Sequence, residues 1–434
     1  MFYREEKKTK PIKVPVFKHM DPIESADHLL KKKKRQNAIQ RIKESLAYPA
    51  TVYQKRVEPL IANIAAYYQL LPETSLYFSH RGGLLDRALY RTEAALHLMR
   101  QLMIHDASNM PSEEQKVWLY ALCSAGLLQG IGKLYTEYKI TLYNNMGTVV
   151  KAWEPLLEEM HPAGVYYAHT FVREDSDSEI LRKHVTMLLA QQLMPKEGFA
   201  LLASHPTIFR AWLALLEEER DGAGPLDAIL DRANALTIQT YLSEFIDAHK
   251  HILEPGAGRS GSFLDNTPEQ TQTSEKEQIL GAEFLLWVRD AFASGKFVLN
   301  QPPVKAEIFP TGVVLSPEVF DLFIQEHHKV KNKVLIQRAL NTWKHHQLMD
   351  KHEDKLVGKV RLDHAILPDT VTVFHKKTAQ TTTVRTLDLI HDIDAYDRDY
   401  EHAAVMLPLL TATGEWAKPD NASPKLTTGM QTRG

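Results

Sequence analysis

Apolar residues at helical spacing dominate the first 250 residues of this chain and constrain its fold more than any other feature. Val57, Leu60, Ile61 and Ile64 recur at intervals of three and four, so they share one face of a helix. Similar stretches follow near residues 84–96, 116–128, 180–193, 208–216 and 226–245. The pattern predicts a mainly α fold, with a helical domain over residues 46–253.

One interruption of this pattern is typical of a β-hairpin. Residues 138–143 alternate between polar and apolar or aromatic side chains, and residues 148–153 are rich in β-branched and aromatic residues. Between them, residues 144–147 supply the Asn and Gly that tight turns favour. We therefore expect a single hairpin inserted among the helices.

Chain length, cysteine content and the lack of long apolar runs limit the class of protein. With 434 residues, the chain has room for about two to three domains of ~150 residues each. Its single cysteine, Cys123, excludes an intramolecular disulfide and a cysteine-based zinc site. Because the sequence has no run of about 18 apolar residues and no apolar leader, we expect a cytoplasmic protein without membrane insertion.

Positive charge is concentrated near the N-terminus. Residues 1–43 contain 13 Lys or Arg and 5 Asp or Glu, although the whole chain has a formal net charge of −2. Such a run is typical of an arm that binds DNA or a partner, or of a solubilising leader, and we expect residues 1–45 to be poorly ordered. The candidates for DNA contact in this leader are Lys31, Lys32, Lys33, Lys34 and Arg35.

A second domain is expected after a linker. Residues 254–276 are rich in Gly, Ser, Thr, Gln and Pro, which is the composition of a flexible linker. Residues 277–390 carry helical patterns followed by strand-like ones at 359–362, 370–374 and 382–389, which predicts an α+β winged-helix-like domain. Residues 391–434 form an acidic stretch and a polar tail that we expect to be disordered.

Basic residues of this second domain are further candidates for DNA contact. Arg338 and Lys344 lie on or beside a predicted helix at 334–343, and Lys359 and Arg361 lie where a wing would follow. In a winged helix, a basic helix and a wing can lie along phosphates. The alternative interpretation is an ordinary charged helix face.

Three blocks of the sequence resemble the MobH-type relaxases, the TraI proteins of integrating conjugative elements and some large plasmids. They are residues 82–89 (Gly-Gly-Leu-Leu-Asp-Arg-Ala-Leu), 125–133 (Ala-Gly-Leu-Leu-Gln-Gly-Ile-Gly-Lys) and 229–237 (Ile-Leu-Asp-Arg-Ala-Asn-Ala-Leu-Thr). The region from Phe284 resembles the C-terminal winged-helix domain of that family. The resemblance implies an HD-like helical domain with an inserted hairpin, a winged helix and a role in conjugation.

The departures from the family pattern lie at its metal ligands. The resemblance implies a divalent metal held by His, a His-Asp pair and a distant Asp, but Arg87, Gln129, Gly130 and Asn234 stand at these places. A fixed cation opposes a metal, an amide is a weak ligand and glycine offers no side chain. We therefore predict no metal, no cofactor and no catalytic residue here. His80 and His184 are residual candidates for ligands, or else packing and surface residues.

These observations favour a non-catalytic relaxase-like component of a conjugation or type IV secretion system that binds DNA or acts as a scaffold. Its expected partners are DNA and secretion or coupling proteins. One alternative is an active metal-dependent relaxase or HD phosphohydrolase with displaced ligands. Another is an adaptor that contacts only proteins.

Overall fold

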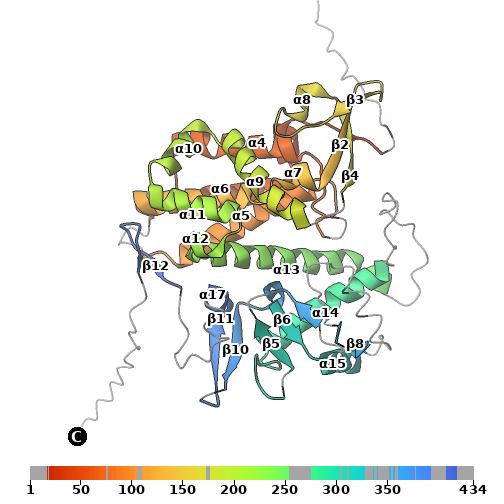
Figure 1. Ribbon diagram of the computed structural model, residues 1–434, viewed down its shortest axis with the longest axis vertical. Helices are drawn as coiled ribbons and strands as arrows, with labels where there is room; N and C mark the ends of the chain where they lie inside the picture. Colours follow the sequence, from red (N-terminus) through yellow and green to blue (C-terminus); the bar gives the residue numbers. More distant parts are fainter. Residues whose placement is uncertain are drawn as a thin grey trace, which may run out of the picture.

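The computed structural model describes residues 17, 19–74, 77–104, 110–172, 176–253, 275–303, 305–309, 312–327, 336, 340, 351–352, 355–356, 360–376, 378–391 and 407–417. Within these residues the chain is mainly helical with small antiparallel sheets, as the sequence predicts. The long helix α13 (Pro225–Leu253) crosses the middle of the molecule (Figure 1). Helices of the first 250 residues cover one side of it, and the elements between α14 and α17 pack against the other.

The N-terminal domain is built from helices whose apolar faces meet in one core. They are α1 (Ala26–Leu30), α2 (Lys33–Leu46), α3 (Ala50–Arg56), α4 (Glu58–Tyr68), α5 (Gly83–Gln101), α6 (Glu113–Leu128), α7 (Lys133–Thr136), α8 (Met160–Ala163), α9 (Ser176–Leu193), α10 (Lys196–Ala203), α11 (Pro206–Leu216) and α12 (Arg220–Ala223). The residues that defined the helical spacing, Leu60, Ile61 and Ile64, are buried. Their burial supplies the apolar contact that holds α4 in place.

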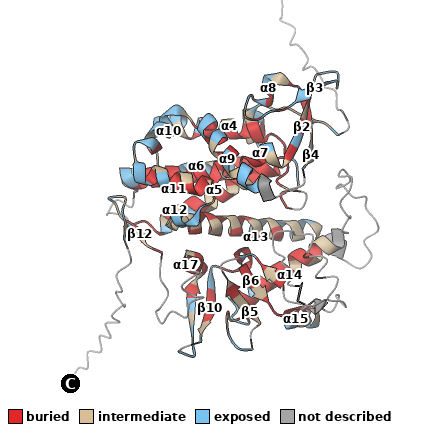
Figure 2. Cartoon of the chain, viewed as in Figure 1, coloured by how far each residue is buried: buried red, intermediate tan, exposed pale blue. Residues whose placement is uncertain are grey.

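Helix α6 is the centre of this core (Figure 2). At Gly126 an added Cβ would lie 2.8 Å from the Thr92 hydroxyl of α5, so glycine permits the close approach of the two helices. Among the described residues, 113–136 are long and apolar enough to span a membrane, but 89% of the apolar window is buried inside the protein. This is the burial expected of a core helix.

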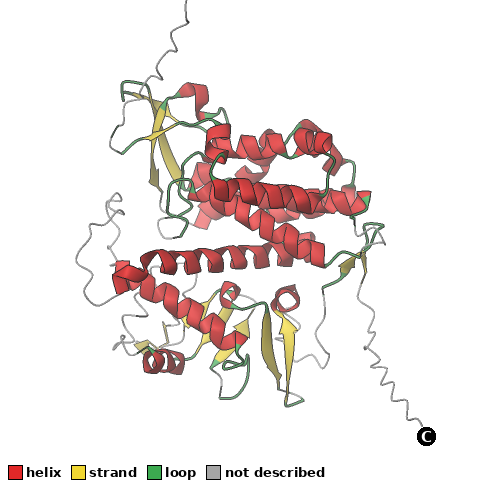
Figure 3. Ribbon diagram, turned by 180° about the vertical axis from the view of Figure 1, so that it is seen from behind, coloured by secondary structure: helices red, strands yellow, loops and turns green. Residues whose placement is uncertain are grey.

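The expected hairpin forms part of a larger sheet (Figure 3). Strands β2 (Tyr138–Tyr143) and β3 (Val149–Ala152) pair antiparallel, and the sheet continues through β4 (Tyr166–Phe171) to β1 (Asp21–Pro22) in the order β1-β4-β2-β3. Sequence spacing missed the other two strands because β1 is very short and β4 is separated from the hairpin by α8.

The prediction of a poorly ordered leader over residues 1–45 is wrong for its described part beyond residue 20, where β1, α1 and α2 form. Arg35 is wholly buried and cannot contact DNA. Its guanidinium bonds Asp86 Oδ1 at 2.5 Å and the carbonyl oxygens of Leu29 and Gly82. A buried cation is stable only with such partners, which the local run of lysines does not reveal.

The C-terminal domain packs helices against small sheets. Its elements are α14 (Glu275–Ala293), β5 (Ala306–Phe309), β6 (Gly312–Leu315), α15 (Glu318–Glu326), β7 (Lys351–His352), β8 (Lys355–Leu356), β9 (Val360–Leu362), the 3-10 helix η2 (His364–Ile366), β10 (Thr370–His375), β11 (Gln380–Arg385) and α17 (Thr386–His391). The strands form the antiparallel groups β5-β6-β9, β7-β8 and β10-β11.

One expected strand of this domain is partly a helix, and two other expected segments lie mostly outside the described residues. The strand expected over 382–389 ends at Arg385, where α17 begins; its alternating leucines are buried on a helix instead, and Asp388 in its first turn binds Arg385 at 2.6 Å. The helix expected at 334–343 lies outside the described residues apart from Ile336 and Leu340, which are buried. The linker at 254–276 also lies outside them, except for the start of α14.

The expectation of a disordered tail is wrong for residues 411–417, and residues 407–417 together form a clasp on α6. Strands β12 (Leu409–Leu410) and β13 (Trp416–Ala417) pair, and Leu407 and Leu410 are fully buried. The Trp118 indole donates to the Gly414 carbonyl at 2.9 Å, and Gln115 donates to the Leu410 carbonyl at 3.0 Å. Main-chain acceptors and two apolar anchors therefore fix this segment on α6. The acidic residues 392–400 lie outside the described part.

Removing the clasp should destabilise the N-terminal domain. Truncation after residue 406 removes two buried leucines, each worth about 1.5–3 kcal/mol, so we expect a loss of about 3 kcal/mol or more. Urea unfolding followed by tryptophan fluorescence measures it. Truncation after residue 417 is the control and should leave the midpoint unchanged; equal midpoints for both truncations would contradict the role of the clasp.

Candidate functional site

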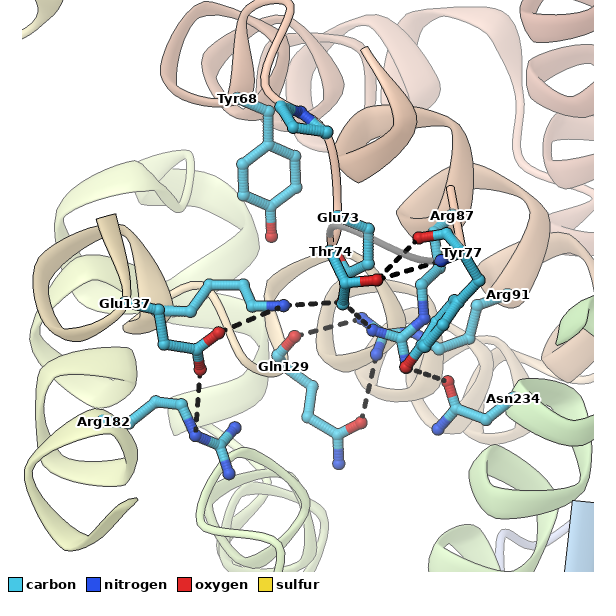
Figure 4. A network of polar contacts seen from close by, with 12 residues as sticks. Tyr68, Glu73, Thr74, Tyr77, Arg87, Arg91, Gln129, Glu137, Arg182 and Asn234 are labelled. Atoms are coloured by element: carbon cyan, nitrogen blue, oxygen red, sulfur yellow. Dashed lines mark hydrogen bonds and ion pairs between the residues drawn. The ribbon is translucent and has the colours of Figure 1, made fainter. Parts of the chain in front are cut away.

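A polar pocket of about 610 Å³ lies where the loop after α4, the α6–α7 turn and helices α5, α9 and α13 meet. The four positions at which the sequence departs from the expected metal ligands all line it: Arg87, Gln129, Gly130 and Asn234. Figure 4 shows three of them, Arg87, Gln129 and Asn234. The structure therefore brings these residues together from three separate parts of the chain, as the resemblance implies.

Glu73 is the buried centre of the pocket's charge network. Its side chain is 2% exposed and forms ion pairs with Arg87 and with Lys133, whose Nζ lies 2.6 Å from Oε1. Burial alone would raise the pKa of Glu73, but the charges of Arg87 and Lys133 outweigh it and hold the pKa at about 2. Glu73 is therefore ionised at neutral pH.

Arg87 and Arg91 lie one turn apart on α5 and both point into this network (Figure 4). Arg87 also donates to Asn234 Oδ1 at 3.4 Å. Arg91 donates to the Gly126 carbonyl at 2.9 Å and the Gln129 carbonyl at 3.1 Å, at the C-terminal end of α6 where helix carbonyls lack partners. Burial, then the charge of Arg87, lower the pKa of Arg91 to about 10, so it keeps its charge.

The outer wall of the pocket carries a second set of charges. Arg182 lies 3.9 Å from Glu137 and binds Glu218 at 2.6 Å. On the α12–α13 side, Arg220 lies 3.7 Å from Asp227 and 3.4 Å from Asp231. Burial, then the charge of Asp227, raise the pKa of Asp231 to about 7.

The residues present do not fit a divalent metal. The Arg87 guanidinium is paired with Glu73, and the Gln129 amide is held between Arg91 and the Leu215 carbonyl. Gly130 has a φ of +76°, so an aspartate there would be strained. In the described part of the chain, no group of three or more His, Cys, Asp or Glu side chains is arranged to hold a metal.

Neither residual histidine lines the pocket. His80 is half-exposed, and its Nε2 lies 2.8 Å from the same Asp86 carboxylate that binds Arg35. Its ring also stacks near Tyr241 of α13. His184 is exposed on α9. The structure therefore separates the two histidines from the place where ligands were expected.

The candidates for DNA contact are scattered. The four leader lysines stay exposed at the α1–α2 junction, where Lys34 lies 3.1 Å from Glu244. Arg361 is half-buried on β9, paired with Val314 of β6. Arg338, Lys344 and Lys359 lie outside the residues whose side chains are described.

Residues 20–249 match the TraI_2 family, whose description is "Putative helicase". The match spans more than half of the chain, which therefore belongs to this family. The sequence's resemblance to TraI proteins is confirmed at this level, whereas the MobH type and the winged helix stay predictions. No curated protein matches the chain.

Sequence reasoning missed the partners that complete the site. Glu73 lies in a loop with no periodicity, and nothing local marks it as buried. Lys133 ends the block at residues 125–133 that carries the family resemblance. Arg91 follows Arg87 by four residues, a spacing that places both on one helix face. That spacing was the one signal available for the network.

The raised pKa of Asp231 predicts a specific pH dependence of stability. Between pH 3.8 and about 7 the folded state holds a proton that the unfolded chain has lost, so stability falls as pH rises. Asp231→Asn should therefore change the melting temperature more favourably at pH 8 than at pH 4, by an amount limited by the 40% exposure of the side chain. Differential scanning fluorimetry at both pH values measures this, with exposed Asp221→Asn as the control; an equal gain at both pH values would contradict it.

Proposed function

We propose that this TraI-family protein is a non-catalytic relaxase-like component of a conjugation or type IV secretion system, located in the cytoplasm and bound to DNA. The observation that carries the proposal is the ion pair between Arg87 and Glu73 at the place where the resemblance implies a metal. A guanidinium held there by a buried carboxylate opposes a divalent ion.

A helicase motor is not part of this proposal, although the family's description names one. ATP-driven motors of the P-loop class need a Gly-x-x-x-x-Gly-Lys-Ser/Thr loop, and this sequence contains none. Gly132-Lys133 is followed by Leu134 and preceded five residues earlier by Leu127. The proposal therefore keeps the family's link to DNA and leaves out its motor.

DNA contact is assigned to the leader lysines and the C-terminal domain. Lys31 and Lys33 are exposed at the start of α2, where phosphate oxygens can reach them. Contacts of this kind release counterions, so binding should be weak, sensitive to salt and indifferent to base sequence. A purely protein-binding adaptor is the second candidate, because small helical and winged domains also serve as docking modules.

Elemental analysis tests the non-catalytic part. The full chain, purified without a chelator, should contain far less than one transition metal per molecule, because the Arg87 guanidinium lines the pocket where a ligand would be needed. Near-stoichiometric Fe, Mn or Zn would overturn the proposal in favour of an enzyme with displaced ligands.

Fluorescence anisotropy with labelled DNA tests the DNA-binding part. The double substitution Lys31→Glu with Lys33→Glu should weaken binding at low salt by about tenfold and reduce the salt dependence, since two phosphate contacts become repulsive. Exposed Lys139→Glu with Lys196→Glu changes the net charge equally and should have little effect. If the wild-type chain binds no DNA even at low salt, the adaptor function replaces this one.

A further inference from the structure

We propose that the inner half of the pocket binds an oxyanion, namely the phosphate or carboxylate group of a small molecule. The inner half is defined by Arg87, Arg91, Lys133 and Glu73, which all line the cavity. The inference goes beyond the proposed function and does not require DNA binding. Where the resemblance implies a metal ion, this chain supplies a positive centre made of its own side chains.

The charges of the inner half do not balance. Three cations face one carboxylate, since Glu73 pairs with Arg87 and Lys133, and Arg91 bonds only carbonyl and amide oxygens among the described residues. The next carboxylate, Glu137, lies 3.7 Å from Lys133 and is shared with Arg182. Positive charge is therefore in excess among these four residues, where burial weakens screening by water, whereas the lining of the whole pocket has six carboxylates and five cations.

One donor of the inner half has no partner. The Nε of Arg87 is buried and forms no hydrogen bond in the described part of the chain. Buried donors are rarely left without a hydrogen bond, and an exception calls for an explanation such as an unseen ligand. Guanidinium groups present their donors in a planar fork that matches phosphate and carboxylate oxygens.

The pocket lining also includes acidic side chains outside the inner half. Asp227 and Asp231 of α13 also line the cavity, with Arg220 as their shared cation. They repel an anion but accept hydrogen bonds from hydroxyl or amino groups. A cavity of about 610 Å³ also has room for more than one phosphate, because small-molecule sites span about 300–1,000 Å³. The ligand class is thus a small molecule that carries both an oxyanion and hydrogen-bond donors.

Isothermal titration calorimetry on the full chain tests this with inorganic phosphate, acetate and ribose 5-phosphate at constant ionic strength. We expect ribose 5-phosphate to bind more tightly than phosphate or acetate, and ribose and chloride not to bind. Arg87→Gln should weaken ribose 5-phosphate by about tenfold or more, the loss typical of a charge-assisted hydrogen bond. Arg41→Gln, which removes a surface arginine paired with Glu93, is the matched control and should change nothing.

A second variant tests the same inference if Arg87→Gln does not fold. Glu73→Gln removes the one carboxylate paired in the inner half while preserving its shape, so it should tighten ribose 5-phosphate several-fold. Absence of phosphate binding at millimolar concentration, weaker binding by folded Glu73→Gln, or equal effects of Arg87→Gln and Arg41→Gln would each overturn the inference. Phosphate binding without DNA binding would overturn only the DNA-binding function, and the reverse result would overturn only this inference.

Discussion

Helix α13 is packed on both of its sides, and this double packing positions the pocket and the C-terminal domain together. Adjacent residues of α13 serve different sides: Asp231 lies beside Arg220 at the pocket wall, whereas Arg232 is buried against the C-terminal domain. There, the Arg232 guanidinium donates to the Leu367 carbonyl at 2.7 Å and binds Asp369 at 2.5 Å. A shift of α13 would therefore change both contacts at once.

The buried charges of the pocket depend on one another in the same way. Breaking a buried ion pair by removing one partner costs about 3–5 kcal/mol, because the other charge stays buried and uncompensated. Arg87, which stands where the resemblance implies a metal ligand, is thus tolerated only with Glu73 as its partner, and an aspartate in place of Gly130 would have a strained backbone. The metal site that the resemblance implies would therefore need several simultaneous changes in this chain.

The sequence predicted those parts of the fold that depend on local spacing. Helical periodicity identified α4, α6 and α11, and the turn residues identified the β2–β3 hairpin, because both signals lie within a few residues. The burial of Arg35 was beyond such reasoning, since its partner Asp86 lies 51 residues away and its neighbours are exposed lysines. The burial of Glu73 was not predicted for the same reason.

The clasp is held in place by its contacts with α6, which its own sequence does not reveal. Residues 407–417 pack near the N-terminal end of α6, through Gln115 and Trp118, and Arg91 caps the C-terminal end of the same helix at the pocket. Asp388 of α17 also accepts the Leu407 amide at 2.6 Å, which ties the clasp to the C-terminal domain. Two rigid helices, α6 and α13, thus link the pocket to residues from the far end of the chain. Because interiors are close-packed, the geometry that holds Arg87 against Glu73 rests on contacts made throughout the described sequence.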